Sequence, residues 1–305
     1  MTISPIGATV LILAAGIMTG FGVLTGILTI VLLVRRQEIK TLWTRFFAWF
    51  VIIPPLLIPL VLGRHAFQAV MLMLSLFCFN EYARATGLWK DRPLMIAASI
   101  AITVIFIPIF LFDYGFYQAF PVFAASFIIV LPIIRGRFTH MIQQTCLGIL
   151  GIIYFGWFLS HVAYIRNLPH GIEYIFILIV LVESNDAFAY VWGKILGKHK
   201  LIPLISPNKT IEGALGALIS VIVLALFLRL LVPYVEVPIM LLLAALVSVL
   251  GMLGDLVISF IKRDLSIKDT GSFIPGHGGL LDRFDSLILV APAFFHFLRF
   301  FYYGT

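Results

Sequence analysis

The acidic residues of this sequence are unevenly distributed, and eight of the 14 fall in two short segments, 183–213 and 254–286. The eight are Glu183, Asp186, Glu212, Asp255, Asp264, Asp269, Asp282 and Asp285. Around these segments the chain is almost entirely apolar. Ionisable groups in or beside membrane-spanning helices are energetically costly, so their presence indicates a function. The two segments are therefore the candidate site of this protein's chemistry.

The second segment combines carboxylates with basic residues. Asp255 falls within an apolar run, about two helical turns before Lys262 and Arg263. Asp282 and Asp285 are three residues apart at the start of the next apolar run, so both side chains can lie on one face of a helix. Carboxylates of this kind suit Mg²⁺, which shares its coordination sphere between protein oxygens, waters and substrate phosphates. The segment predicts a site for a divalent metal with a polyphosphate.

A glycine-rich sequence, PGHGG at residues 275–279, precedes the two carboxylates of the last apolar run. Its small side chains allow backbone N–H groups to approach an anion closely. The sequence also leads into a helix N-terminus, which favours negative charge. We therefore expect this loop to lie against a phosphate group.

The first segment contributes a similar set of groups. Asp186 lies in or near an apolar run, and the sequence SPNKT at 206–210 supplies two hydroxyls and Lys209. We predict a phosphate-holding loop here. Glu212 has a second interpretation as a capping residue at the start of the following helix.

The composition is that of a membrane protein. Hydrophobic residues make up 62% of the chain and charged residues only 11%, whereas soluble domains are about 25% charged. A spanning helix needs about 20 mostly apolar residues. We predict an all-α, polytopic helical bundle with ten candidate spans: 8–34, 46–63, 66–84, 93–112, 115–134, 144–165, 172–193, 213–232, 237–260 and 281–303.

The basic residues predict the topology. With ten spans, only Arg64, Arg166, Arg229 and Arg299 fall on one side, and all the other basic residues fall on the opposite side. Basic loops face the cytoplasm, so both acidic segments are expected on the cytoplasmic side. The net charge of +7 is then explained by topology and by attraction to anionic lipid headgroups. Nothing in the pattern calls for nucleic-acid binding.

Residues 259–285 carry the pattern S-x-x-K-R, then K-D, then P-x-H-G-G-x-x-D-R-x-D. This pattern resembles the signature of the phosphatidate cytidylyltransferases, the CDP-diacylglycerol synthases, at every fixed position. The upstream sequence ND…AY…GK…GKHKLIP is similar to the family as well, whereas the N-terminal part matches only as a hydrophobic pattern. We expect residues 171–305 to carry the site and residues 1–170 to form a lipid-embedded scaffold. One departure is Ile258, which stands where many family members have Glu.

The resemblance implies a reaction in which CTP and phosphatidic acid, or a related lipid phosphate, give CDP-diacylglycerol and pyrophosphate with Mg²⁺. It implies a multi-pass protein of the bacterial inner membrane whose site faces the cytoplasm. Asp255 and Asp282 are the expected metal ligands. The residues expected to take part in catalysis are Asp255, Lys262, Arg263, Lys268, Asp269, His277, Asp282, Arg283 and Asp285. Those expected to bind the nucleotide are Asp186, Ser206, Lys209, Thr210, Gly278 and Gly279.

Two other functions fit parts of the sequence. A CTP-dependent lipid-alcohol kinase would share the membrane setting and the nucleotide, but its product would be CDP rather than pyrophosphate. A transporter is disfavoured because the polar groups gather at one membrane face and no internal repeat is visible. The sequence leaves the oligomeric state open, a homodimer included.

Overall fold

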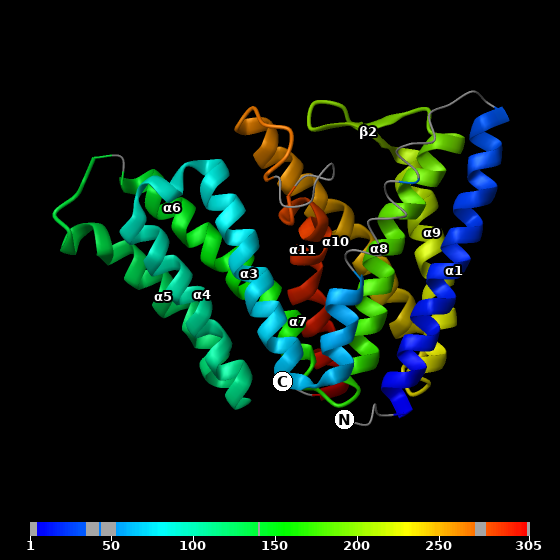
Figure 1. The fold of residues 1–305 in the computed structure, drawn as a ribbon, viewed down its shortest axis with the longest axis horizontal. Helices are drawn as coiled ribbons and strands as arrows, with labels where there is room; N and C mark the ends of the chain where they lie inside the picture. Colours follow the sequence, from blue (N-terminus) through cyan, green and yellow to red (C-terminus); the bar gives the residue numbers. More distant parts are fainter. Residues whose placement is uncertain (1–4, 35–42, 44–52, 140, 272–278, 304–305) are drawn as a thin grey trace. The chain divides into compact units, whose positions relative to one another are not determined.

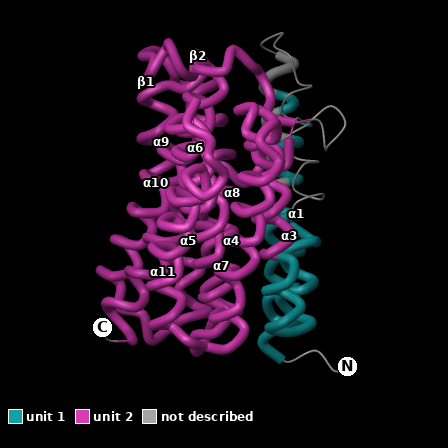
Figure 2. The backbone as a smooth tube through the Cα atoms, turned by 90° about the vertical axis from the view of Figure 1, so that its left-hand side faces the viewer, with its two compact units in different colours: residues 1–70 teal, residues 71–305 magenta. Residues whose placement is uncertain are grey.

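The computed structural model describes residues 5–34, 43, 53–139, 141–271 and 279–303, which Figure 1 shows as a ribbon. By its contacts the chain divides into two units, Met1–Val70 and Met71–Thr305, which are coloured separately in Figure 2. Both acidic segments belong to the second unit. The fold of that unit therefore determines the geometry of the candidate site.

The first unit contains α1 (Pro5–Val34), a short apolar helix at Ile53–Leu62 and the start of α3 (Arg64–Thr86). With 30 residues, α1 covers the first predicted span. The second predicted span, 46–63, lies partly outside the described residues, and the helix at Ile53–Leu62 forms its remaining part.

The second unit is a bundle of apolar helices. After α3 these are α4 (Arg92–Leu111), α5 (Tyr114–Ile134), α6 (Met141–Gly151), α7 (Leu159–Ile165), α8 (Gly171–Leu196), α9 (Ile211–Leu228), α10 (Val237–Asp264) and α11 (Leu281–Leu298). A π-helical segment, Ile152–Phe158, joins α6 to α7, and another, Arg299–Tyr303, continues α11. Short 3₁₀ turns occupy Leu88–Lys90 and Arg229–Leu231.

Within the described residues, eight helices are long and apolar enough to cross a membrane, the first at Arg64–Thr86 and the last at Leu281–Tyr303. They coincide with the last eight of the ten predicted spans, with boundaries shifted by a few residues. The all-α, polytopic membrane architecture is therefore confirmed.

The starts of several helices are fixed by capping side chains. The carboxylate of Asp91 accepts a hydrogen bond from the backbone N–H of Leu94 at the start of α4, and Asp113 caps α5 in the same way. The hydroxyl of Thr210 caps α9. Such caps satisfy backbone donors that the first helical turn leaves unpaired.

The helices of the second unit pack as two groups. One group is formed by α8, α9, α10 and α11, and the other by α4 to α7 with the π-helical segment; α11 contacts α7 and thereby joins them. Small residues allow the close approaches. At Gly156, a Cβ would come within 2.9 Å of Ile102 on α4, and at Gly254 on α10 it would come within 2.7 Å of the carbonyl oxygen of Asp285 on α11.

A two-stranded hairpin connects α8 to α9. Its antiparallel strands, β1 (Lys200–Ile202) and β2 (Ser206–Thr210), pair Lys200 with Thr210 and Ile202 with Ser206. The sequence SPNKT, which we predicted to be a loop, is therefore a strand. The carboxylate of Glu212 fastens the hairpin, because it accepts hydrogen bonds from the backbone N–H of Lys198 at 3.0 Å and from that of His199 at 3.2 Å.

The hairpin and the C-terminal end of α10 lie at the same end of the second unit (Figure 1). Nε of Arg263 at the end of α10 donates to the carbonyl oxygen of Ile205 over 3.2 Å, which joins the two segments directly. Helices that start at this end, such as α9 and α11, end at the other, where Arg229 and Arg299 lie. The predicted charge asymmetry is thus present within this unit.

We expect Gly254→Ala to destabilise the bundle, because the added methyl group would press against the backbone of α11 at Asp285 and Ser286. Overpacking of this kind costs about 1–3 kcal/mol. Equilibrium unfolding in detergent measures the change. Gly115→Ala, in the first turn of α5, is the matched control, since its methyl group would make only ordinary contacts and alanine favours helix. Equal stability of the two variants would contradict close α10–α11 packing.

Candidate active site

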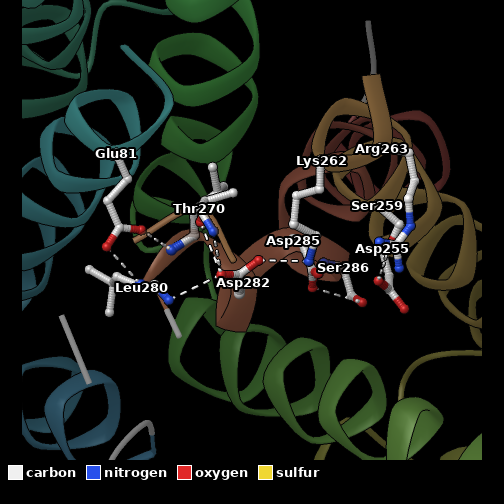
Figure 3. A network of polar contacts seen from close by, with 12 residues as sticks. Glu81, Asp255, Ser259, Lys262, Arg263, Thr270, Leu280, Asp282, Asp285 and Ser286 are labelled. Carbon is white, nitrogen blue, oxygen red and sulfur yellow. Dashed lines mark hydrogen bonds and ion pairs between the residues drawn. The ribbon is translucent and has the colours of Figure 1, made fainter. Parts of the chain in front are cut away.

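Two lysine–aspartate ion pairs form the centre of the candidate site, and Figure 3 shows one of them, between Lys262 and Asp282. Nζ of Lys209 on β2 lies 2.5 Å from Oδ2 of Asp255 on α10. Nζ of Lys262 on α10 lies 2.7 Å from Oδ1 of Asp282 on α11. The four side chains are between 7% and 25% exposed, so solvent screens these charges only weakly.

In both ion pairs the second carboxylate oxygen is held by other donors. Oδ1 of Asp255 accepts a hydrogen bond from the hydroxyl of Ser259 at 3.1 Å. Oδ2 of Asp282 accepts three, each at 3.0 Å, from the backbone N–H and hydroxyl of Thr270 and from the backbone N–H of Gly279. One oxygen of each aspartate is therefore fixed, and the other faces a cation.

Two further carboxylates, those of Asp186 and Asp285, are joined to each other through Ser286. Its hydroxyl donates to Oδ2 of Asp186 on α8 at 3.0 Å, and its backbone N–H donates to Oδ1 of Asp285 at 2.7 Å. Asp285 and Ser286 are buried. Asp285 also lies within electrostatic range of Asp255, Asp186 and Lys262, so carboxylates from α8, α10 and α11 lie in one region of the second unit.

The pKa of Lys209 reflects the carboxylates that surround it. Burial alone would lower the pKa of its ammonium group, but the carboxylates of Asp255 and Asp186 outweigh this effect and raise the pKa above the ordinary lysine value, with a smaller contribution from Asp285. Lys262 lies within electrostatic range of Asp255 and Asp285 as well as pairing with Asp282. Each lysine therefore interacts with several carboxylates at once.

The donor set fits a divalent cation. Four carboxylates, those of Asp186, Asp255, Asp282 and Asp285, lie within electrostatic range of the ammonium groups of Lys209 or Lys262. Within the described ranges, no three acidic, histidine or cysteine side chains are already gathered around one point as ligands. Mg²⁺ commonly takes only one or two protein carboxylates and completes its shell with waters and substrate phosphates. Asp255 and Asp282, each with one fixed oxygen, match that requirement.

The start of α11 differs from the sequence-based expectation. We expected backbone N–H groups there to lie against a phosphate. In the structure, the backbone N–H of Gly279 is bound to Asp282, and those of Leu280 and Leu281 are bound to the carboxylate of Glu81 on α3. These three donors are therefore occupied by side chains of the protein itself.

The remaining predicted residues occupy varied positions. Ser206 and Thr210 are the two ends of β2, and Thr210 caps α9. Lys268 and Asp269 are exposed between α10 and α11, and Arg283 is partly buried in the first turn of α11. His277 and Gly278 lie outside the described residues.

Ile258, the departure from the family pattern, is fully buried on α10. It packs in the apolar interior, so it adds core volume where a carboxylate would require a polar partner. Ser259, the next residue, supplies the hydrogen bond to Asp255.

Sequence reasoning missed three contributors to the network: Glu81, Thr270 and Ser286. Glu81 lies on α3, outside both acidic segments of the sequence. Its partners are about 200 positions further along the chain. Ser286 follows the D-R-x-D pattern directly, and that adjacency was the one available signal for its role.

The chain is similar to known proteins over most of its length. The model of the cytidylyltransferase family matches residues 43–301. The chain belongs to this family. Asp255 and the signature segment 259–285 both lie within the matched region.

Three curated relatives illustrate the similarity. A phosphatidate cytidylyltransferase of Staphylococcus haemolyticus is 32% identical over 260 residues, 84% of this chain and 96% of that protein. One of Bacillus subtilis is 47% identical over 154 residues, 49% of this chain and 56% of that protein. YnbB of Escherichia coli, named as an uncharacterized protein, is 42% identical over 158 residues, 48% of this chain and 53% of that protein. The chain thus spans about half the length of the last two relatives.

We expect Lys209→Met and Asp255→Asn to be non-additive in the free energy of unfolding, because each single change leaves a buried charge without its partner. The double variant should be more stable than the sum of the single effects predicts, with a coupling of about 0.5–3 kcal/mol. Equilibrium unfolding in detergent measures the cycle. Lys209→Met combined with Asp264→Asn, an exposed residue at the end of α10, provides the control cycle. Additive effects in both cycles would show that the Lys209–Asp255 pair does not form.

Proposed function

We propose that this protein transfers CMP from CTP to the phosphate of phosphatidic acid, or of a related lipid phosphate, in a Mg²⁺-dependent reaction that releases pyrophosphate. The observation that carries the proposal is that Asp255 and Asp282 have the same pattern of contacts. Each has one oxygen fixed by hydrogen bonds and the other paired with a lysine. Membership of the cytidylyltransferase family supports the use of CTP.

The two ion pairs suggest how the site receives its substrates. A lysine beside a carboxylate partly neutralises its charge. Both groups can still exchange this partner for a group of the bound nucleotide or for the metal. When the nucleotide binds, we expect Lys209 and Lys262 to turn toward its phosphate oxygens, while Asp255 and Asp282 keep one oxygen fixed and offer the other to the metal. The charges then stay balanced throughout binding, which avoids leaving an unpaired ion in a poorly solvated site.

The reaction itself places modest demands on the protein. A phosphate oxygen of the lipid forms a bond to the α-phosphorus of CTP, and the bond from that phosphorus to the pyrophosphate leaving group breaks. The acceptor is already an anion, so no strong general base is required. Mg²⁺, when bound, neutralises charge on the phosphates. The protein contributes by orienting the reactants and by placing lysine ammonium groups where negative charge develops.

The location of the network at one end of the apolar bundle suits two substrates of different solubility. A lipid phosphate can approach from the bilayer interface and CTP from water. We propose that this end faces the cytoplasm of a bacterial cell, with the protein in the inner membrane. The positions of the basic residues support this orientation, and the bacterial relatives support the membrane.

We expect purified protein supplied with CTP, Mg²⁺ and phosphatidic acid to form CDP-diacylglycerol and pyrophosphate, and Asp282→Asn to reduce the rate at least about 100-fold. Asp255→Asn should have a similar effect. Labelled CTP distinguishes the products, since a lipid-alcohol kinase would release CDP instead.

The matched control is Asp264→Asn, which removes an exposed carboxylate from the same stretch of chain and should leave the rate near that of wild type. A wild-type rate in Asp282→Asn, or a requirement for a free lipid alcohol as acceptor, would refute the proposed reaction.

A further inference from the structure

Glu81 binds the start of α11 with both carboxylate oxygens. Oε1 accepts a hydrogen bond from the backbone N–H of Leu280 at 3.0 Å, and Oε2 accepts one from that of Leu281 at 2.8 Å (Figure 3). We propose that Glu81 is a positioning residue, which holds the start of α11 so that Asp282 keeps the orientation needed for metal and nucleotide binding. This inference rests on the proposed function, and it assigns a role at the site to a residue from the predicted scaffold.

The glycines around the site are arranged to admit this carboxylate. A Cβ at Gly279 would lie 2.5 Å from Oε2 of Glu81, and a Cβ at Gly271 would overlap the same carboxylate. The backbone on either side of residues 272–278 therefore closes around Glu81. Two positions of the glycine-rich connection are thus explained by contact with a side chain of α3.

The interaction has the features of a strong anchor. A carboxylate at a helix N-terminus is favoured by the helix dipole, and hydrogen bonds to a charged acceptor are stronger than neutral ones. Glu81 is supported by its neighbour Tyr82, which is buried, packs on Phe155 with ring centroids 5.0 Å apart, and donates to the carbonyl oxygen of Leu147 at 3.3 Å. Glu81 therefore extends from a well-packed part of α3.

The bonded residues lie immediately before Asp282. Fixing the backbone at Leu280 and Leu281 fixes the point from which the Asp282 side chain leaves the helix. Asp282 in turn holds Thr270 and Gly279 and pairs with Lys262. Because both oxygens of Glu81 are bound to the backbone, its role is to orient Asp282 rather than to act as a further metal ligand.

The test compares Glu81→Gln with Asp113→Asn in the full-length protein in detergent. Asp113 is a matched control because its carboxylate also caps a helix, α5, but at the opposite end of the bundle. Hydrogen exchange at the amides of Leu280 and Leu281 should be at least about tenfold faster in Glu81→Gln and unchanged in Asp113→Asn.

In Glu81→Gln, the Mg²⁺ concentration for half-maximal rate of CDP-lipid formation should rise about 10–100-fold, as found for groups that orient metal ligands. Excess Mg²⁺ should restore part of the rate.

Unchanged exchange at Leu280 and Leu281 would overturn the inference, whatever the activity. Faster exchange with a wild-type Mg²⁺ requirement would also overturn it, because Glu81 would then be purely structural. If wild-type protein forms no CDP-lipid, the proposed reaction fails, and with it the positioning role; the exchange experiment then still decides whether Glu81 anchors α11.

Discussion

The structure depends on the cost of placing ionised carboxylates within an apolar helical bundle. An isolated charge in such surroundings is strongly unfavourable, so each carboxylate must be paired or hydrogen-bonded. Asp255, Asp282 and Glu81 each satisfy this constraint with both oxygens. Their donors come from elements that are distant in sequence. Meeting the constraint therefore brings α3, β2, α10 and the start of α11 together at one end of the second unit.

The contacts of the two central aspartates are of two kinds, hydrogen bonds and ion pairs. Hydrogen bonds from Ser259, Thr270 and Gly279 hold one oxygen of each central aspartate and do not need to change when a ligand binds. The ion pairs to Lys209 and Lys262 involve the other oxygens, and lysine side chains are long enough to move to a phosphate. This division between fixed and exchangeable contacts suits a reaction governed by positioning and charge neutralisation.

Much of this architecture is predictable from sequence because hydrophobic length and charge asymmetry are local signals. The eight spans from α3 to α11 followed from them. The hairpin at 200–210 was missed because β1 has only three residues, and β2 is polar and contains a proline. Glu81 was missed because its backbone partners, about 200 positions away, leave no pattern near it.

The most direct measurement is an experimental structure of the protein with CTP and Mg²⁺ in the absence of lipid phosphate. The account predicts that one oxygen of Asp255 and one of Asp282 contact the metal, while Nζ of Lys209 and of Lys262 contact the triphosphate and both lysine–aspartate pairs are broken. A complex in which the nucleotide is bound elsewhere and both pairs remain intact would contradict it.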